Sequence, residues 1–150
     1  MNSERSSDEM WEKIEINKEL VKNALLLAKR DLKTAKNVFE DKDYDWCLSI
    51  AYNAMLQAGR ALMFSKGYRP KGKYKHVAVV EFVRSRFGRE FSDLMLFIFN
   101  KTRKKRHIAV YEQVNIVGEE EAKNAITGQK DLLRRSKRYC LEYDCRWLCL

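Results

Sequence analysis

The fold is decided by the stretch AYNAMLQAGRALM, residues 51–63. Its alanines recur at three- and four-residue steps, which places them on one side of a helix. They are Ala51, Ala54, Ala58 and Ala61. Small side chains let a partner helix approach closely. We therefore predict a helix, capped by Asp41 or Asp43 and running to about Lys66, at the centre of a bundle.

The sequence before and after this helix predicts further helices and no strands. One amphipathic helix is expected from about Asp8 to Phe39, and Gly67 with Pro70 is expected to end the central helix. The inward positions of the first helix are predicted to be Leu20, Ala24, Leu27, Ala28, Leu32, Ala35 and Phe39. The aromatic residues expected to pack in the core or at its boundary are Trp11, Tyr44, Trp46, Tyr52 and Tyr68.

The second half of the chain predicts a short helix over residues 76–87 and two longer ones. Residues 94–99 are apolar on every face, which is typical of a helix surrounded by others, and they run directly into the basic residues 101–107. A loop over residues 113–117 precedes a last helix that opens with three glutamates at 119–121. Its inward residues are expected to be Ala122, Ala125, Ile126, Leu132, Leu133 and Tyr139. The predicted fold is an all-α, antiparallel bundle of four to five helices.

Composition favours one globular domain over residues 1–150, with a ragged polar N-terminus (1–8) and a cysteine-rich C-terminal extension (140–150). Apolar residues make up 45% of the chain and charged residues 34%. No apolar run approaches the roughly 18 residues that a membrane span requires, and the start has no signal-peptide core. A cytoplasmic location with no membrane contact is therefore expected.

The net charge of +9 predicts attraction to polyanions such as RNA, nucleotides or an acidic protein. Cys140, Cys145 and Cys149 crowd the C-terminus without CxxC spacing, and Cys47 stands far from them. This arrangement favours ordinary thiols over a metal site. The chain also lacks a P-loop, GxGxxG and GxSxG, so we expect no bound cofactor.

The most unusual segment is NKTRKKRHIAVYE, residues 100–112. On a continuing helix, Arg103, His107 and Tyr111 form one stripe, and Arg106 lies about 100° round from His107. Arginine suits phosphate, histidine moves protons near neutral pH, and together they could perform metal-independent phosphodiester cleavage. The alternative is a solvated basic helix end that complements the helix dipole.

His76 follows the basic loop 69–75 and has two interpretations. It could join a polyanion site with Lys71, Lys73 and Lys75, or it could pack or cap locally at a helix start. From this reasoning, the candidate catalytic residues are Arg106, His107 and Tyr111. The candidate nucleotide- or RNA-binding residues are Lys101, Arg103, Lys104, Lys105 and His76.

Several of these segments resemble those of HEPN domains. Residues 51–63 resemble the family's second-helix pattern AYxAxxxAxxAL. Residues 67–70 and 76–82 are similar to its post-helix glycine and following helix, and residues 103–112 resemble its fourth-helix motif. Glu119 to Leu133 is similar to its final helix, so the resemblance extends in order from about Leu20 to Tyr139.

The resemblance implies a helical bundle that dimerises and acts on RNA or nucleotides, often as a metal-independent ribonuclease toxin paired with a minimal nucleotidyltransferase. The family's nuclease motif is written RNxxxH. With Arg106 as its arginine, His107 takes the asparagine position and Tyr111 the histidine position. With Arg103 as the arginine instead, His107 follows after only three intervening residues.

Because the motif is degenerate, we expect a nucleotide- or RNA-binding protein, the homodimeric helical partner of a nucleotidyltransferase antitoxin in a toxin–antitoxin-like pair. The alternatives are an active metal-independent endoribonuclease toxin and a non-catalytic protein-interaction bundle.

Overall fold

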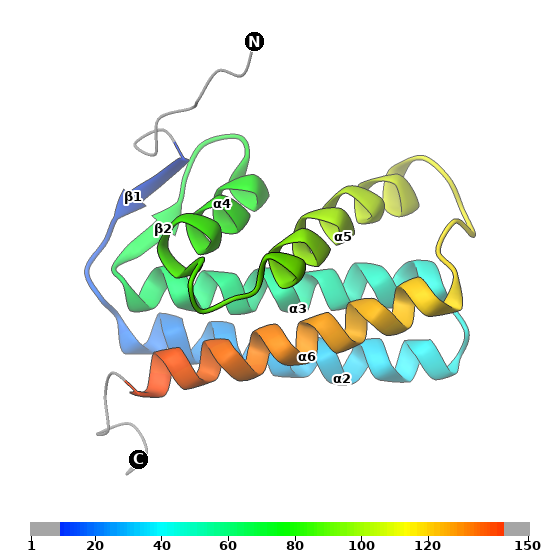
Figure 1. Cartoon of the computed structure of the whole chain (residues 1–150), viewed down its shortest axis with the longest axis horizontal. Helices are drawn as coiled ribbons and strands as arrows, with labels where there is room; N and C mark the ends of the chain where they lie inside the picture. The colour runs from blue at the N-terminus through cyan, green and yellow to red at the C-terminus, as the bar shows by residue number, and fades with distance from the viewer. Residues whose placement is uncertain (1–9, 143–150) are drawn as a thin grey trace.

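The structure is a computed structural model that describes residues 10–142, and within them it is a bundle of five helices beside one small two-stranded sheet (Figure 1). The helices are α2 (Lys18–Glu40), α3 (Tyr44–Ser65), α4 (Lys75–Phe87), α5 (Asp93–Tyr111) and α6 (Glu119–Glu142). The strands are β1 (Trp11–Lys13) and β2 (Tyr68–Pro70). Helices α2, α3 and α6 lie side by side with their long axes aligned, and α4 and α5 pack on α3 (Figure 1). The predicted all-α bundle is confirmed.

Helix α3 lies at the centre of the bundle, as its alanines predict. It contacts all four other helices, and Ala51, Ala58 and Ala61 have no exposed surface. A Cβ placed on Gly59 would lie only 2.5 Å from Cγ1 of Val79 on α4. The absence of a side chain at this position therefore allows α4 to pack closely against α3.

Two predictions at the N-terminal side were wrong. The first long helix begins at Lys18 rather than near Asp8, because the Asn17 side chain accepts a hydrogen bond of 2.9 Å from the backbone amide of Glu19 and caps the helix there. Residues 11–13 instead pair antiparallel with residues 68–70, although no strand was expected. Gly67, with φ of 77°, supplies the left-handed exit from α3 that the sequence predicts and leads into β2.

Four residues that were predicted to be buried or to pack at the core boundary are instead exposed. Leu94 and Phe97 on α5 are 67% and 61% exposed, because within residues 10–142 the other helices contact only part of the α5 surface. Leu20 is exposed, because the buried face of α2 begins at Val21 and continues through the predicted Ala24, Ala28 and Ala35. Trp46, in the first turn of α3, also lies at the surface.

The last helix agrees with the prediction, and its inward residues are buried except for the half-buried Tyr139. The Asp45 side chain at the start of α3 fixes the loop before α6, since it accepts hydrogen bonds from the backbone amides of Asn115 (2.6 Å) and Val117 (3.0 Å). The polar residues 1–8 and the cysteines Cys145 and Cys149 lie outside the described residues.

Two features are absent from residues 10–142. None of the helices there is long and apolar enough to cross a membrane. In the same part of the chain, no group of three or more histidine, cysteine, aspartate or glutamate side chains is arranged to hold a metal ion.

Candidate nucleic-acid interface

Helix α5 continues unbroken through the basic segment, as the stripe of Arg103, His107 and Tyr111 requires. The rings of His107 and Tyr111 lie 5.2 Å apart between their centroids, and both side chains are about two-thirds exposed. Nε2 of His107 lies 3.7 Å from Oε1 of Glu112. These two predicted catalytic residues therefore lie together at the solvent-exposed end of α5.

Arg106 is directed differently from His107. Its Cζ atom lies 5.6 Å from the centroid of the ring of Tyr52, a residue of α3 with no exposed surface. The Nε atom of Arg106 is buried and has no hydrogen-bond partner in the structure. The three predicted catalytic residues are thus divided, with Arg106 against the bundle and the other two at the surface.

His76 contacts the same tyrosine from α4. The Tyr52 hydroxyl lies 3.1 Å from Nδ1 of His76, and the two ring centroids are 5.7 Å apart. Burial raises the pKa of Tyr52 above its usual value, although the positive charges of Arg103 and Arg106 oppose this effect. The phenol therefore keeps its proton and can donate it to Nδ1 of a neutral His76.

The pKa of His76 is lowered, first by burial and then by the positive charges of Arg106, Arg103 and Arg60. All these causes disfavour the imidazolium form, so His76 is neutral near pH 7. Three arginines from two helices, α3 and α5, thus act on one histidine. We call Arg60, Arg103 and Arg106 the arginine cluster.

The arginine cluster lacks acidic partners. Within residues 10–142, none of its three members forms an ion pair with a carboxylate. Nε of Arg103 donates to the side-chain oxygen of Asn100 at 3.1 Å, and Cζ of Arg60 lies 5.4 Å from the ring centroid of Phe64. Nε of Arg60 is buried without a hydrogen-bond partner, as in Arg106. The cluster is therefore a concentration of positive charge that an anion could neutralise.

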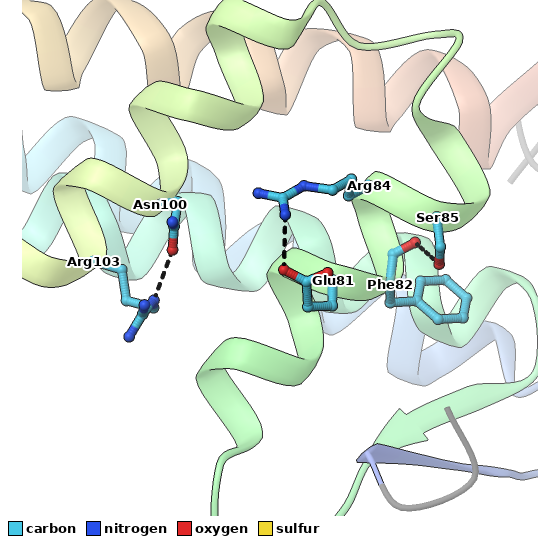
Figure 2. Close-up of polar contacts among 6 residues, drawn as sticks. All are labelled: Glu81, Phe82, Arg84, Ser85, Asn100 and Arg103. Carbon is cyan, nitrogen blue, oxygen red and sulfur yellow. Dashed lines mark hydrogen bonds and ion pairs between the residues drawn. The ribbon is translucent and has the colours of Figure 1, made fainter. Parts of the chain in front are cut away.

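An arginine of α4 shows what an acidic partner does. Figure 2 shows Arg84 paired with Glu81 at 3.0 Å, whereas Arg103 of α5 donates to the neutral Asn100. Among the predicted binding lysines, Nζ of Lys105 lies 3.5 Å from a carboxylate oxygen of Glu121 on α6. Lys101 and Lys104 are exposed on α5, and Lys101 lines the groove between α5 and α6 rather than the side of the arginine cluster.

Sequence reasoning missed two members of this group. Arg60 was part of the decisive stretch but was assigned no role, and Tyr52 was interpreted as packing alone. A signal was present, because residues 52, 56 and 60 follow one another at four-residue steps and so share one side of a helix. What the sequence could not show is that α4 and α5 bring His76 and Arg106 to that side.

Comparison with known protein families identifies the kind of domain. The family model for the HEPN domain matches residues 21–139, which includes α3, α4 and α5 with the arginine cluster. HEPN domains are associated with nucleotide and RNA interaction and often dimerise. A comparison with curated proteins finds no match. Since the match spans most of the chain and the helical bundle agrees with it, the chain belongs to the HEPN domain family.

Proposed function

We propose that the protein binds the phosphates of RNA or nucleotides at the arginine cluster. The observation that carries this proposal is the set of three guanidinium groups, two with a buried and unpartnered Nε, around a neutral His76. Guanidinium groups bind phosphate oxygens through paired hydrogen bonds, and each bound phosphate would neutralise part of the charge of the three arginines. The net charge of +9 would steer polyanions toward this surface.

The test is binding of a short single-stranded RNA in EDTA at several salt concentrations, with Arg103→Ala and Arg106→Ala variants. Each variant should bind more weakly, and the slope of log affinity against log salt should become shallower by about 0.7 for each phosphate that the variant no longer neutralises. The control is Arg89→Ala, which removes the same charge just beyond the far end of α4, about 20 Å from His76 by helix geometry. An equally large loss of RNA affinity in Arg89→Ala would show that the overall positive charge attracts RNA and that the arginine cluster is not a specific site.

Cleavage is the second candidate function, and one observation favours it: a neutral histidine lies among arginines. In the tautomer that donates Nδ1–H to the Tyr52 hydroxyl, Nε2 of a neutral His76 can accept a proton while a guanidinium stabilises charge on phosphate, so His76 with Arg106 could cleave a phosphodiester without metal. His107, the histidine predicted from the motif, lies at the surface while Arg106 lies against Tyr52. The RNA should therefore also be checked for products, with His76→Ala and His107→Ala tested separately.

A second copy of the chain is the first partner in this proposal. Leu94 and Phe97 border a groove of about 430 Å³ between α5 and α6 that carries Lys101 on one side and Asp131 on the other. Because both signs of charge flank one apolar surface, two copies related by a twofold axis can pair them. Sedimentation of the wild type as a dimer and of Phe97→Glu as a monomer would support this contact.

A minimal nucleotidyltransferase antitoxin is the other proposed partner, and the resemblance of the sequence to toxin–antitoxin HEPN proteins is its support. A nucleotidyltransferase reading frame beside this one, whose product co-purifies with the chain, is the expected finding. Failure of the two products to associate when expressed together would remove the toxin–antitoxin part of the proposal and leave phosphate binding untouched.

A further inference from the structure

A large pocket is lined by His76 and by no residue of α5. It has a volume of about 1030 Å³ and lies between the two-stranded sheet, the segment leading into α2, the end of α3 and the start of α4. The pocket is lined by the cationic residues Lys18, Arg60, Arg69, Lys71 and Lys75, together with His76. The pocket is large enough for a mononucleotide.

Positive charge exceeds negative charge in this pocket. Its acidic lining residues are Glu12 and Glu15, and Glu12 is paired with Arg69 at 2.6 Å. Arg60 and Lys75 form no ion pair with a carboxylate within residues 10–142, and the Nε of Arg60 is buried without a partner. The unneutralised charge therefore gathers where the end of α3 meets the start of α4.

The start of α4 adds to this charge. Tyr74, at the N-cap position, makes no side-chain capping hydrogen bond, and the first turn contains no acidic residue. The positive end of the helix dipole and its first backbone amides are thus without the usual compensation. Lys75 and His76, the first two residues of this 13-residue helix, line the pocket.

Part of the pocket lining is apolar. Ile16 and Leu20 line the pocket and are 64% and 38% exposed, and the buried Leu56 and Phe64 add apolar lining on either side of Arg60 on α3. An inorganic anion would leave the exposed apolar residues uncovered. A ligand with a phosphate at one end and a flat, largely apolar ring system at the other would contact both kinds of lining.

We propose that this pocket binds a nucleotide through a terminal phosphate monoester, with the phosphate at Arg60, Lys75 and the amides of α4 and the base on Ile16 and Leu20. This inference rests on the proposed function and specifies its ligand as a phosphorylated end. The end could belong to a free mononucleotide or to an RNA strand, since both carry the same chemical group. His76 lines the pocket and contacts Tyr52, whose ring also contacts Arg106 of α5, so a strand held by its end in the pocket could extend along α5.

The experiment compares a short oligoadenylate carrying a 5′-phosphate, the same strand with a 5′-hydroxyl, AMP and adenosine, each titrated into the wild-type chain. The phosphorylated strand should bind about tenfold or more tightly than the hydroxyl strand, because it gains at least one charge-assisted hydrogen bond. AMP should compete with it and adenosine should not. If AMP binds but the phosphorylated strand has no advantage, the source is a free nucleotide.

Variants separate this proposal from the proposed function. Arg60→Gln and Lys75→Gln should abolish the advantage of the 5′-phosphate, and Lys75→Gln is the safer variant because Lys75 is exposed. Arg103→Ala on α5 should weaken both strands alike and preserve their ratio. Arg89→Gln, at the other end of α4, serves as the charge control.

Two results would overturn the pocket proposal: equal affinity for both strands with no binding of AMP, or an advantage of the 5′-phosphate that persists in folded Arg60→Gln and Lys75→Gln. Binding of AMP to a protein whose RNA binding is unaffected by Arg103→Ala and Arg106→Ala would instead reject RNA binding at the arginine cluster and retain the pocket. Thermal unfolding followed by circular dichroism establishes that each variant is folded.

Discussion

The hydroxyl of Tyr52 and Nδ1 of His76 lie 3.1 Å apart and join α3 to α4 beside the arginine cluster. Tyr52 is fully buried and also carries Arg106 on its ring, so one side chain positions two candidate functional residues from two other helices. The contact between Tyr52 and His76 therefore contributes both to core packing and to the candidate site.

Removal of the Tyr52 hydroxyl tests this contact. Tyr52→Phe should lower the free energy of unfolding by about 1–2 kcal/mol, because it deletes one hydrogen bond and leaves a partly buried histidine nitrogen unpaired. Urea denaturation measures the change as a lower midpoint with an unchanged slope. Tyr111→Phe is the matched control, since that side chain is 68% exposed, and it should change stability by no more than about 0.5 kcal/mol. Equal effects of the two variants would mean that the hydrogen bond adds no net stability.

The lowered pKa of His76 makes stability depend on pH. Its value in the folded protein lies below the ordinary 6.5, so in the window between the two the unfolded chain binds more protons than the folded chain. Stability is therefore complete above about pH 6.5 and falls as the pH drops from there toward the folded pKa. The groups that act on His76 are Tyr52 and Arg60 of α3 and Arg103 and Arg106 of α5.

NMR titration measures this shift directly. The chain has two histidines, so His107→Gln leaves a single imidazole signal, that of His76. The midpoint of its titration should lie below 6.5, and the stability difference between wild type and His76→Gln should shrink as the pH falls through that window. A midpoint above 6.5 would contradict the arrangement of charges around His76.

The order and type of the helices could be predicted from the sequence because hydrophobic period and small residues are local signals. The alanines of α3, the glycine at 67 and the glutamates at 119–121 each mark an element without reference to the rest of the fold. The strand at residues 11–13 could not be predicted in this way, because three residues carry too little pattern and depend on pairing with residues 68–70.

The site could be predicted only in part, for a related reason. The stripe of Arg103, His107 and Tyr111 is local to one helix and was found, whereas the arginine cluster combines side chains from two helices around a residue of a third. Arg60 shares one side of α3 with Tyr52, but the sequence does not show what packs on that side. Its role depends on the crossing of α3 with α4, which the sequence indicates only through Gly59.

Even a single methyl group added at Gly59 should destabilise the fold. Gly59→Ala places a Cβ 2.5 Å from Cγ1 of Val79, whose β-branched side chain has little rotamer freedom in a helix. Overpacking of this kind costs about 1–3 kcal/mol, which exceeds the gain of up to about 1 kcal/mol from better helix propensity. Chemical denaturation should therefore show a net loss of stability.

A second substitution tests the cause of that loss. Val79→Ala removes the atom that the new Cβ would meet, so the double variant should be less destabilised than the sum of the two single variants. Additive effects would show that the loss does not come from this contact.

The Asp45 carboxylate should hold in place the loop that follows the exposed end of α5. Its two carboxylate oxygens accept hydrogen bonds from the amides of Asn115 and Val117, and Asn115 is held there at φ of 56°, which is unusual for a residue other than glycine. Hydrogen bonds to a charged group contribute about 1.5–3 kcal/mol each, but Asp45 is only partly buried. Asp45→Ala should therefore lower stability by about 1–3 kcal/mol in total.

Hydrogen exchange locates the effect of Asp45→Ala. The amides of Asn115 and Val117 should exchange faster in the variant, whereas those within α3 should change only with global stability. Asp41→Ala removes the same charge from an exposed position after α2 and should leave both loop amides protected. Because Asn115 lies four residues after Tyr111, release of the loop would also free the end of α5 that carries His107. Unchanged exchange at both amides in Asp45→Ala would show that packing of Val117, rather than the carboxylate, holds the loop.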